Sequence, residues 1–213
     1  MAEFSLQGMF DWAVEWCNKP NVEYWMTAAR RNMRTIDGIT YFDCSSFVFF
    51  AVWLGGGYDI GKLGYPTDLE KYKTMEGQDG YNAWVVHTMT PKLPKIGFTR
   101  YNPEMVVWQP GDILSWYNSR TGDGHTEICY AAPRITMGAH GRKNRTPDEM
   151  VSINTGNVKV GYYQDLWRFS GETPIIPPDP PLPPDTNPGG DPGDSGDKRK
   201  MPLMFYMKPY WKI

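Results

Sequence analysis

The chain has 213 residues, of which 40% are hydrophobic and 15% are aromatic, so it is long enough to bury the core of one domain. Its formal net charge is only -2, which gives no reason to expect a nucleic-acid partner or a strong pull toward a membrane surface. No apolar run reaches the roughly 18 residues of a membrane-spanning helix, and the N-terminus lacks the pattern of a secretory signal peptide. We therefore expect synthesis in a cytoplasm without a signal peptide; if the protein works outside a cell, something other than a signal peptide must deliver it.

The cysteine content argues against a disulfide framework. The three cysteines, Cys17, Cys44 and Cys129, are an odd and sparse set, as expected of a protein made in a reducing compartment. No pair has the CxxC spacing typical of structural zinc sites, and no cofactor is expected. One metal alternative stays open: His125, Cys129 and His140 could bind zinc, because zinc amidases use ligands of this kind.

The first predicted helix begins after Ser5, a residue type that caps helix N-termini. Apolar residues then recur at helical spacing, which predicts one buried face. They are Leu6, Met9, Phe10, Ala13 and Cys17. On this face Cys17 is expected to be a buried small hydrophobe rather than a reactive thiol.

The second predicted helix, residues 44–54, is apolar nearly all round, which is typical of a helix in the middle of a core. Asp43 directly before it could cap its N-terminus. Residues 55–57 are glycines without a following Lys-Ser or Lys-Thr, so they predict a C-cap and turn rather than a phosphate-binding loop. A capping-box pattern predicts a further short helix over residues 67–75.

The second half of the chain predicts a meander of strands. It opens with a turn signal at Pro110-Gly111. The expected strands cover residues 112–117, 125–131, 135–139, 151–154 and 166–169. Helices followed by such strands predict an α+β fold over residues 1–170, with helices packed on one face of an antiparallel sheet.

Two C-terminal segments differ from this domain in composition. Residues 171–197 are rich in Pro, Gly and Asp, which is typical of a semi-stiff linker that forms no core. Residues 198–213 are cationic and rich in aromatic residues and methionine, and the segment is too short to span a membrane. We expect this docking segment to bind a partner subunit, an anionic membrane surface or polymer, or the chain's own domain.

Cys44 and His125 are the candidate reactive pair. A thiolate attacks a carbonyl only if its pKa is lowered, and a helix N-terminus and a neighbouring imidazole both favour the anion. Cys44 opens the buried helix, whose first backbone N–H groups could also bind an oxyanion. His125 follows the short stretch 122–124 (Gly-Asp-Gly), which leaves room for a substrate. If Cys44 and His125 meet, the chain is a cysteine hydrolase or transferase.

The other histidines are candidates for a group that orients His125. His140 follows a neighbouring predicted strand, where it could fix the imidazole tautomer of His125 and stabilise its cation. Along the strand that begins at His125, alternation places Glu127 and Cys129 on the same face as the histidine. His87 is expected to have a structural role.

Three motifs together resemble a known family. Residues 43–48 (Asp-Cys-Ser-Ser-Phe-Val) resemble the nucleophile motif of NlpC-type cell-wall hydrolases, which are papain-like cysteine enzymes. Residues 111–113 (Gly-Asp-Ile) and 124–126 (Gly-His-Thr) resemble the family's strand motifs, in the same order. Over residues 8–170 the chain is most similar to bacteriophage peptidoglycan hydrolases of the pneumococcal-phage amidase type, which share the upstream Val-x-Tyr found here at residues 22–24.

The resemblance implies roles for the catalytic residues. Cys44 would be the nucleophile, and His125 would be the general base and acid. His140 would be the third polar residue. Asn154 is the alternative, because the stretch from His125 to His140 is a few residues longer than is usual in the family.

The resemblance also implies a substrate. Tyr24 would line the pocket near the thiolate, and Asp43 and Ser45, which flank the nucleophile, are expected to contact the substrate as well. That substrate would be peptidoglycan, cut either at the muramoyl–L-alanine amide or within the stem peptide. Residues 198–213 do not resemble choline-binding repeats or bacterial SH3-type wall-binding modules, so the way the protein finds the wall stays open.

The sequence thus predicts a phage endolysin that cuts Gram-positive cell walls through a thioacyl intermediate on Cys44. It would be made in the host cytoplasm and reach the wall through a holin-made hole. One alternative is a lysin carried on the virion tail and used at genome entry, with residues 198–213 docked to a tail protein or a membrane. Another is a structural or adhesive virion component that binds wall fragments without cutting them.

Overall fold

The computed structural model describes residues 4–27, 32–58, 86–141, 146–154, 158–159 and 161–171. The chain divides into two units, residues 1–178 and 179–213, and every described residue belongs to the first. The helix expected at residues 67–75, nearly all of the expected linker and the whole docking segment lie outside the described residues.

Helix α1 (Leu6–Cys17) begins where the sequence predicts. The Ser5 hydroxyl caps it by accepting a hydrogen bond from Gly8 N at 3.0 Å. Four of the predicted core-facing residues are buried, namely Leu6, Met9, Phe10 and Ala13. Cys17 lies in the last turn and packs against the edge of the core. The residue as a whole is partly exposed, but burial raises the pKa of its thiol, as expected of an apolar side chain rather than a reactive one.

The second predicted helix is the most buried element of the described chain. All seven residues of α3 (Cys44–Phe50) are buried, and α3 continues into a π-helical turn, η1 (Ala51–Gly55). The predicted glycine C-cap is confirmed, with Gly56 as the cap residue and Gly57 at a φ of 75°. Since burial of one Phe or Val side chain contributes roughly 1.5–3 kcal/mol, this helix supplies a large part of the core.

A small sheet that the sequence did not predict leads into α3. It contains β1 (Val22–Tyr24), β2 (Asn32–Ile36) and β3 (Ile39–Phe42), in the order β1-β3-β2. β1 runs parallel to β3, with Tyr24 opposite Phe42, and β2 runs antiparallel to β3. Because Phe42 directly precedes Asp43, this pairing brings Tyr24 to the start of α3.

The main sheet has six antiparallel strands in the order β4-β9-β5-β6-β7-β8. The predicted strands are all present, as β5 (Ile113–Tyr117), β6 (Gly124–Ala131), β7 (Ile135–Ala139), β8 (Val151–Asn154) and β9 (Asp165–Phe169). Besides the small sheet, further described elements were not predicted: β4 (Phe98–Tyr101), the short helices α6 (Val86–Met89) and α7 (Pro147–Met150), and a 3₁₀ helix, η3 (Thr90–Ile96).

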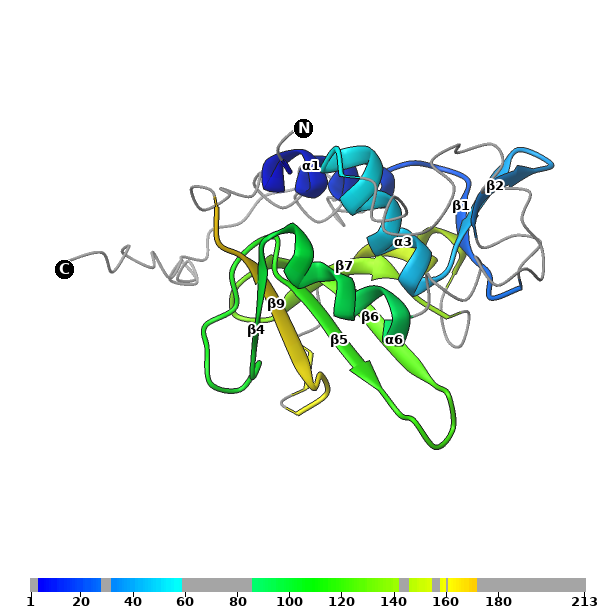
Figure 1. Ribbon diagram of the computed structural model, residues 1–213. Helices are drawn as coiled ribbons and strands as arrows, with labels where there is room; N and C mark the ends of the chain where they lie inside the picture. Colours follow the sequence, from blue (N-terminus) through cyan, green and yellow to red (C-terminus); the bar gives the residue numbers. More distant parts are fainter. Residues whose placement is uncertain are drawn as a thin grey trace, which may run out of the picture. The chain divides into compact units, whose positions relative to one another are not determined.

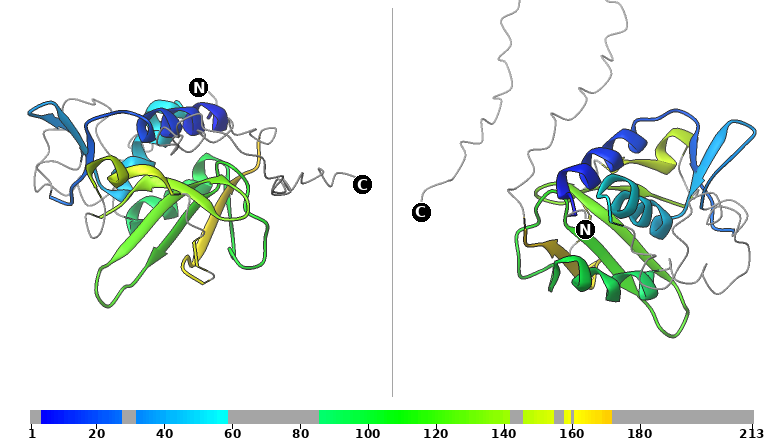
Figure 2. Two further views of the ribbon diagram at one scale, coloured as in Figure 1. Left: turned by 180° about the vertical axis from the view of Figure 1, so that it is seen from behind. Right: turned by 45° about the horizontal axis from the view of Figure 1, so that its top comes forward.

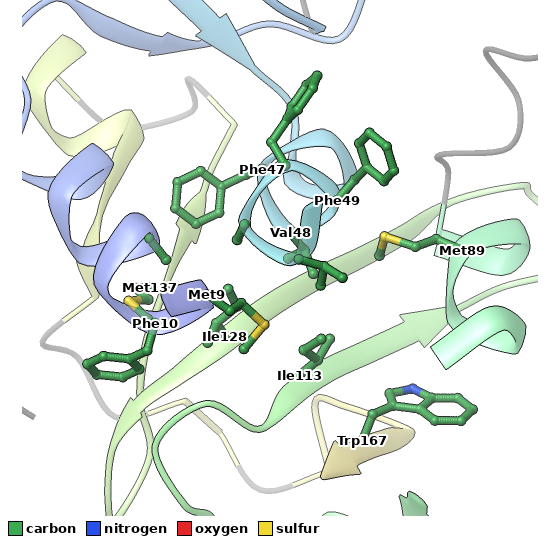
Figure 3. Packing of buried hydrophobic residues seen from close by; sticks show 14 of the residues in the cluster. Met9, Phe10, Phe47, Val48, Phe49, Met89, Ile113, Ile128, Met137 and Trp167 are labelled. Atoms are coloured by element: carbon green, nitrogen blue, oxygen red, sulfur yellow. The ribbon is translucent and has the colours of Figure 1, made fainter. Parts of the chain in front are cut away.

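Helices α1 and α3 lie along the main sheet, as Figure 1 and the view from behind in Figure 2 show. Figure 3 shows the core between them, in which Met9 of α1 and Val48 of α3 lie close to Ile128 of β6. A second, smaller apolar cluster is formed by Trp108, Leu114, Cys129, Tyr163 and Leu166. The predicted α+β architecture is therefore confirmed. None of the described helices is long and apolar enough to cross a bilayer.

Candidate active site

Cys44 is the first residue of α3, and Asp43 fixes its position. The Asp43 carboxylate accepts hydrogen bonds from Ser46 N at 2.7 Å and from Ser45 Oγ at 3.0 Å, and Asp43 N donates to Ser46 Oγ at 2.9 Å. The predicted N-cap is therefore confirmed, as a reciprocal capping box. The Cys44 sulfur lies 4.0 Å from the carbonyl oxygen of Gly124, at the start of β6. The cap thus holds the thiol at the helix N-terminus and beside the strand that carries His125.

His125 faces both the thiol and a carboxylate. Its Nε2 lies 3.2 Å from Glu127 Oε1, and it also hydrogen-bonds with Cys44. Because Nε2 is directed at Glu127, Nδ1 is the nitrogen left for the sulfur. Burial alone lowers the pKa of His125, but the hydrogen bonds and charges of Cys44 and Glu127 outweigh it and hold this pKa well above 6.5. The arrangement therefore favours the imidazolium form of His125 beside the Cys44 side chain.

Glu127 is the centre of the hydrogen-bond network, although it was not among the site residues predicted from the sequence. Its side chain is buried, and Oε1 accepts hydrogen bonds from His125 Nε2 and, at 2.8 Å, from His140 Nδ1. Oε2 accepts one from the Tyr163 hydroxyl. Burial raises the pKa of Glu127, but the hydrogen bonds and charges of the two histidines hold it well below its ordinary value. The carboxylate therefore stays ionised between two imidazoles.

His140 joins the site through Glu127 rather than by touching His125 directly. The two imidazole centroids are 6.0 Å apart, and Glu127 Oε1 lies between the rings as a shared acceptor. The group that orients His125 is thus the carboxylate, and His140 orients the carboxylate. The other nitrogen of His140, Nε2, is buried and has no hydrogen-bond partner within the described part of the chain.

Asn154, the alternative third residue, lies away from this network. It pairs with Thr136, and Thr136 pairs with Cys129, four residues along β6 from His125. Four residues of a strand span about 13 Å. The register therefore favours His140, and through it Glu127, over Asn154.

The sequence contained one signal that points to Glu127. It lies two residues after His125 on a strand, so both side chains project to the same side. A carboxylate buried in such a strand needs donors, and these come from Tyr163 and His140, which are distant in sequence. Burial and the Glu127 charge raise the pKa of Tyr163, so its phenol stays protonated as a donor. The sequence placed His140 near His125, but neither His140 nor Tyr163 could be assigned as a donor to Glu127 without the strand register.

A pocket of about 330 Å³ lies in front of Cys44. Its described lining consists of Tyr24, Met26, Asp43, Cys44, Ser45, Val86, His87, Trp116, Tyr117, Gly122, Asp123 and Gly124. The residues that we expected to contact substrate, Tyr24, Asp43 and Ser45, are thus brought together with the nucleophile. His87, expected to be structural, stacks on Tyr117 with ring centroids 4.5 Å apart and also lines this pocket.

The zinc site considered from the sequence is not formed. Cys129 is buried in the second apolar cluster, and burial together with the Asp112 charge raises the pKa of its thiol, which disfavours the thiolate that binds zinc. The potential ligand atoms that do gather belong to His125, Glu127 and His140, all within 4.8 Å of one another. In the structure these groups are hydrogen-bonded to one another.

Cys44, His125 and Glu127 are arranged in the order that nucleophilic catalysis by a thiol requires. His125 can accept the proton of the thiol, and the carboxylate of Glu127 stabilises the resulting imidazolium. Comparison of the chain with protein-family models, with curated proteins and with solved structures found no match.

Proposed function

We propose that the chain is a cysteine hydrolase of the NlpC-type, papain-like class that cleaves an amide bond in peptidoglycan. Two observations together support the proposal. His125 lies between Cys44 and the buried carboxylate of Glu127, and the Cys44 side chain lines a pocket. A structural cysteine needs neither a raised histidine pKa beside it nor a cavity in front of it.

The reaction would proceed in two steps. The Cys44 thiolate attacks the carbonyl carbon, and the imidazolium of His125 gives its proton to the leaving amine as the C–N bond breaks. Water, deprotonated by His125, then hydrolyses the thioester and restores the thiol. Glu127 holds the imidazole in the tautomer that directs Nδ1 at the sulfur, and it stabilises the cation.

The start of α3 supplies donors for the oxyanion. The backbone N–H of Ser46 donates to the Asp43 carboxylate, and the backbone N–H of Phe47 donates to the Asp43 carbonyl oxygen. The backbone N–H groups of Cys44 and Ser45 belong to the same first turn of α3. They are the candidates for binding the negative oxygen of the tetrahedral intermediate.

Peptidoglycan as the substrate rests on the motif resemblance at residues 43–48, 111–113 and 124–126. The bond would be the muramoyl–L-alanine amide or an amide of the stem peptide. We propose an endolysin as the biological setting. A lysin carried on the virion tail is the alternative, in which residues 198–213 would dock to a tail protein or a membrane.

The proposal is tested by turbidity clearing of Gram-positive cell walls. Wild-type protein should clear the walls, and Cys44→Ala should not. Cys17→Ala is the matched control, because Cys17 is a partly buried cysteine outside the pocket, and it should clear like the wild type. Mass spectrometry of released fragments, scored for new L-alanine N-termini against cut stem peptides, identifies the bond. Binding of walls without clearing by either wild type or Cys44→Ala would instead support a non-catalytic, wall-binding virion component.

The donor set of His125, Glu127 and His140 supports one second candidate, a zinc-dependent amidase. Iodoacetamide and EDTA separate the two mechanisms. The thiol mechanism predicts inactivation by iodoacetamide and no effect of EDTA, whereas the zinc mechanism predicts the reverse.

A further inference from the structure

The described wall of the pocket in front of Cys44 contains carboxylates. Among the described residues that line it, the acidic ones are Asp43 and Asp123, and none is a lysine or an arginine. Asp43 uses its carboxylate to cap α3. Asp123 is exposed, so its carboxylate is the one that an incoming ligand meets at the pocket wall.

Hydrogen bonds of the Asp123 main chain hold this residue beside the nucleophile. Asn118 N donates to the Asp123 carbonyl at 2.8 Å, and Asp123 N donates to Thr121 Oγ1 at 3.3 Å. The next residue, Gly124, packs so closely on β5 that a β-carbon there would lie 3.0 Å from the Trp116 carbonyl oxygen. Because Gly124 also contacts the Cys44 sulfur through its carbonyl, Asp123 is one residue away from that contact.

Aromatic rings form much of the remaining wall. His87 stacks on Tyr117 at an interplanar angle of 25°, and Tyr24 and Trp116 line the same pocket. The faces of tyrosine and tryptophan attract cations through the ring quadrupole. Carboxylate and aromatic faces together therefore match an ammonium group better than an anion.

We propose that Asp123 is a specificity-determining residue that binds an ammonium group of the substrate. This deepens the proposed function and rests on it: the enzyme takes peptides with a free amine near the cleaved amide in preference to peptides in which that amine is acylated. In peptidoglycan the stem peptide carries a diamino acid whose side-chain amine is acylated in cross-links. The preferred stem is then one that is not cross-linked at that amine.

The test compares two N-acetylmuramoyl stem peptides, which contain both candidate bonds and differ only in a free or an acetylated lysine side chain. For wild type, kcat/KM should be higher for the free amine by roughly two- to fivefold, the size expected of an ion pair at an exposed position. Asp123→Asn should bring the ratio close to one, and Asp123→Lys should bring it below one. Asp11→Asn, which removes a charge from the exposed face of α1, should keep the wild-type ratio.

The outcomes separate this proposal from the proposed function. Hydrolysis of both peptides by wild type with a ratio of one, or an unchanged ratio in Asp123→Asn, overturns the role of Asp123 and leaves the hydrolase intact. If neither peptide is cut, calorimetric titration of Cys44→Ala with the same two peptides tests whether Asp123 binds the free amine. Tighter binding of the free amine, lost on adding Asp123→Asn, supports the subsite without the hydrolase, and equal or absent binding overturns the subsite.

Discussion

The carboxylate of Glu127 lies 3.2 Å from Nε2 of His125, two residues earlier on the same strand. Each group raises the stability of the other's charged form, since the pKa of His125 is held above its ordinary value and that of Glu127 below. The proton that His125 would give to a leaving amine is therefore held in place by a buried carboxylate. This relationship makes Glu127 the residue on which the proposed mechanism can be tested most directly.

Replacement of Glu127 by glutamine should lower kcat/KM by roughly 100-fold, because the imidazolium loses its charged partner and its fixed tautomer. The remaining activity should show an alkaline limb shifted to lower pH, since loss of the carboxylate lowers the pKa of His125. A pH–rate profile measures both effects. Glu104→Gln, at an exposed glutamate, is the matched control and should keep the wild-type profile. An unshifted alkaline limb in Glu127→Gln would show that Glu127 does not support the imidazolium.

The same pair predicts how stability depends on pH. The folded-state pKa of Glu127 is depressed, so its stabilising contribution is present above about 4.5 and is lost as pH falls further. The folded-state pKa of His125 is raised, so its contribution is complete below 6.5 and is lost as pH rises through the folded-state pKa. Thermal unfolding of wild type should therefore show its highest midpoint between these limits. Glu127→Gln should flatten the acid side, and equal acid slopes for the two proteins would refute the assignment.

Local signals in the sequence were sufficient for much of the fold. Ser5 and Asp43 are cap residues whose partners lie three residues away, and both caps are present. The predicted strands of the main sheet were recognised because their residues alternate or form short apolar runs. Strand β4 was missed because only its first residue, Phe98, is buried and the next three are exposed. Without alternation an edge strand of this kind resembles a loop.

The centre of the site depended on long-range pairing. Cys44 and His125 were predicted from local motifs, whereas Glu127 gains its role from Tyr163 and His140, which other segments of the chain deliver. No spacing rule fixes that meeting, because it follows from the register of β6 with β7 and from the loop before β9. His140 was predicted as a direct partner of His125, and the structure inserts a carboxylate between them.

Gly138 should be required for the position of Glu127. A β-carbon at Gly138 would lie 3.1 Å from Glu127 Cγ, and the Glu127 side chain cannot easily yield because both of its oxygens are hydrogen-bonded. We expect Gly138→Ala to reduce kcat more than it changes KM, by roughly tenfold, through misplacement of a group that supports general acid–base catalysis. Gly141→Ala is the control, because among the described residues its β-carbon would meet only Tyr24 Cε1, at 3.9 Å. Wild-type kcat in Gly138→Ala would show that the carboxylate tolerates displacement.

The crossing of α1 and η1 should depend on glycine for stability rather than for catalysis. A β-carbon at Gly55 would lie 2.6 Å from both the Gly8 carbonyl oxygen and Trp12 Cβ, so the two backbones would have to separate. Gly55→Ala should lower the free energy of unfolding by about 1–3 kcal/mol, the usual cost of overpacking a core. Because Cys44 lies at the other end of the same helical run, kcat of the folded protein should stay close to that of wild type. Urea unfolding with an unchanged m-value measures the loss. An unfolding free energy equal to that of wild type would mean that the helices can move apart at little cost.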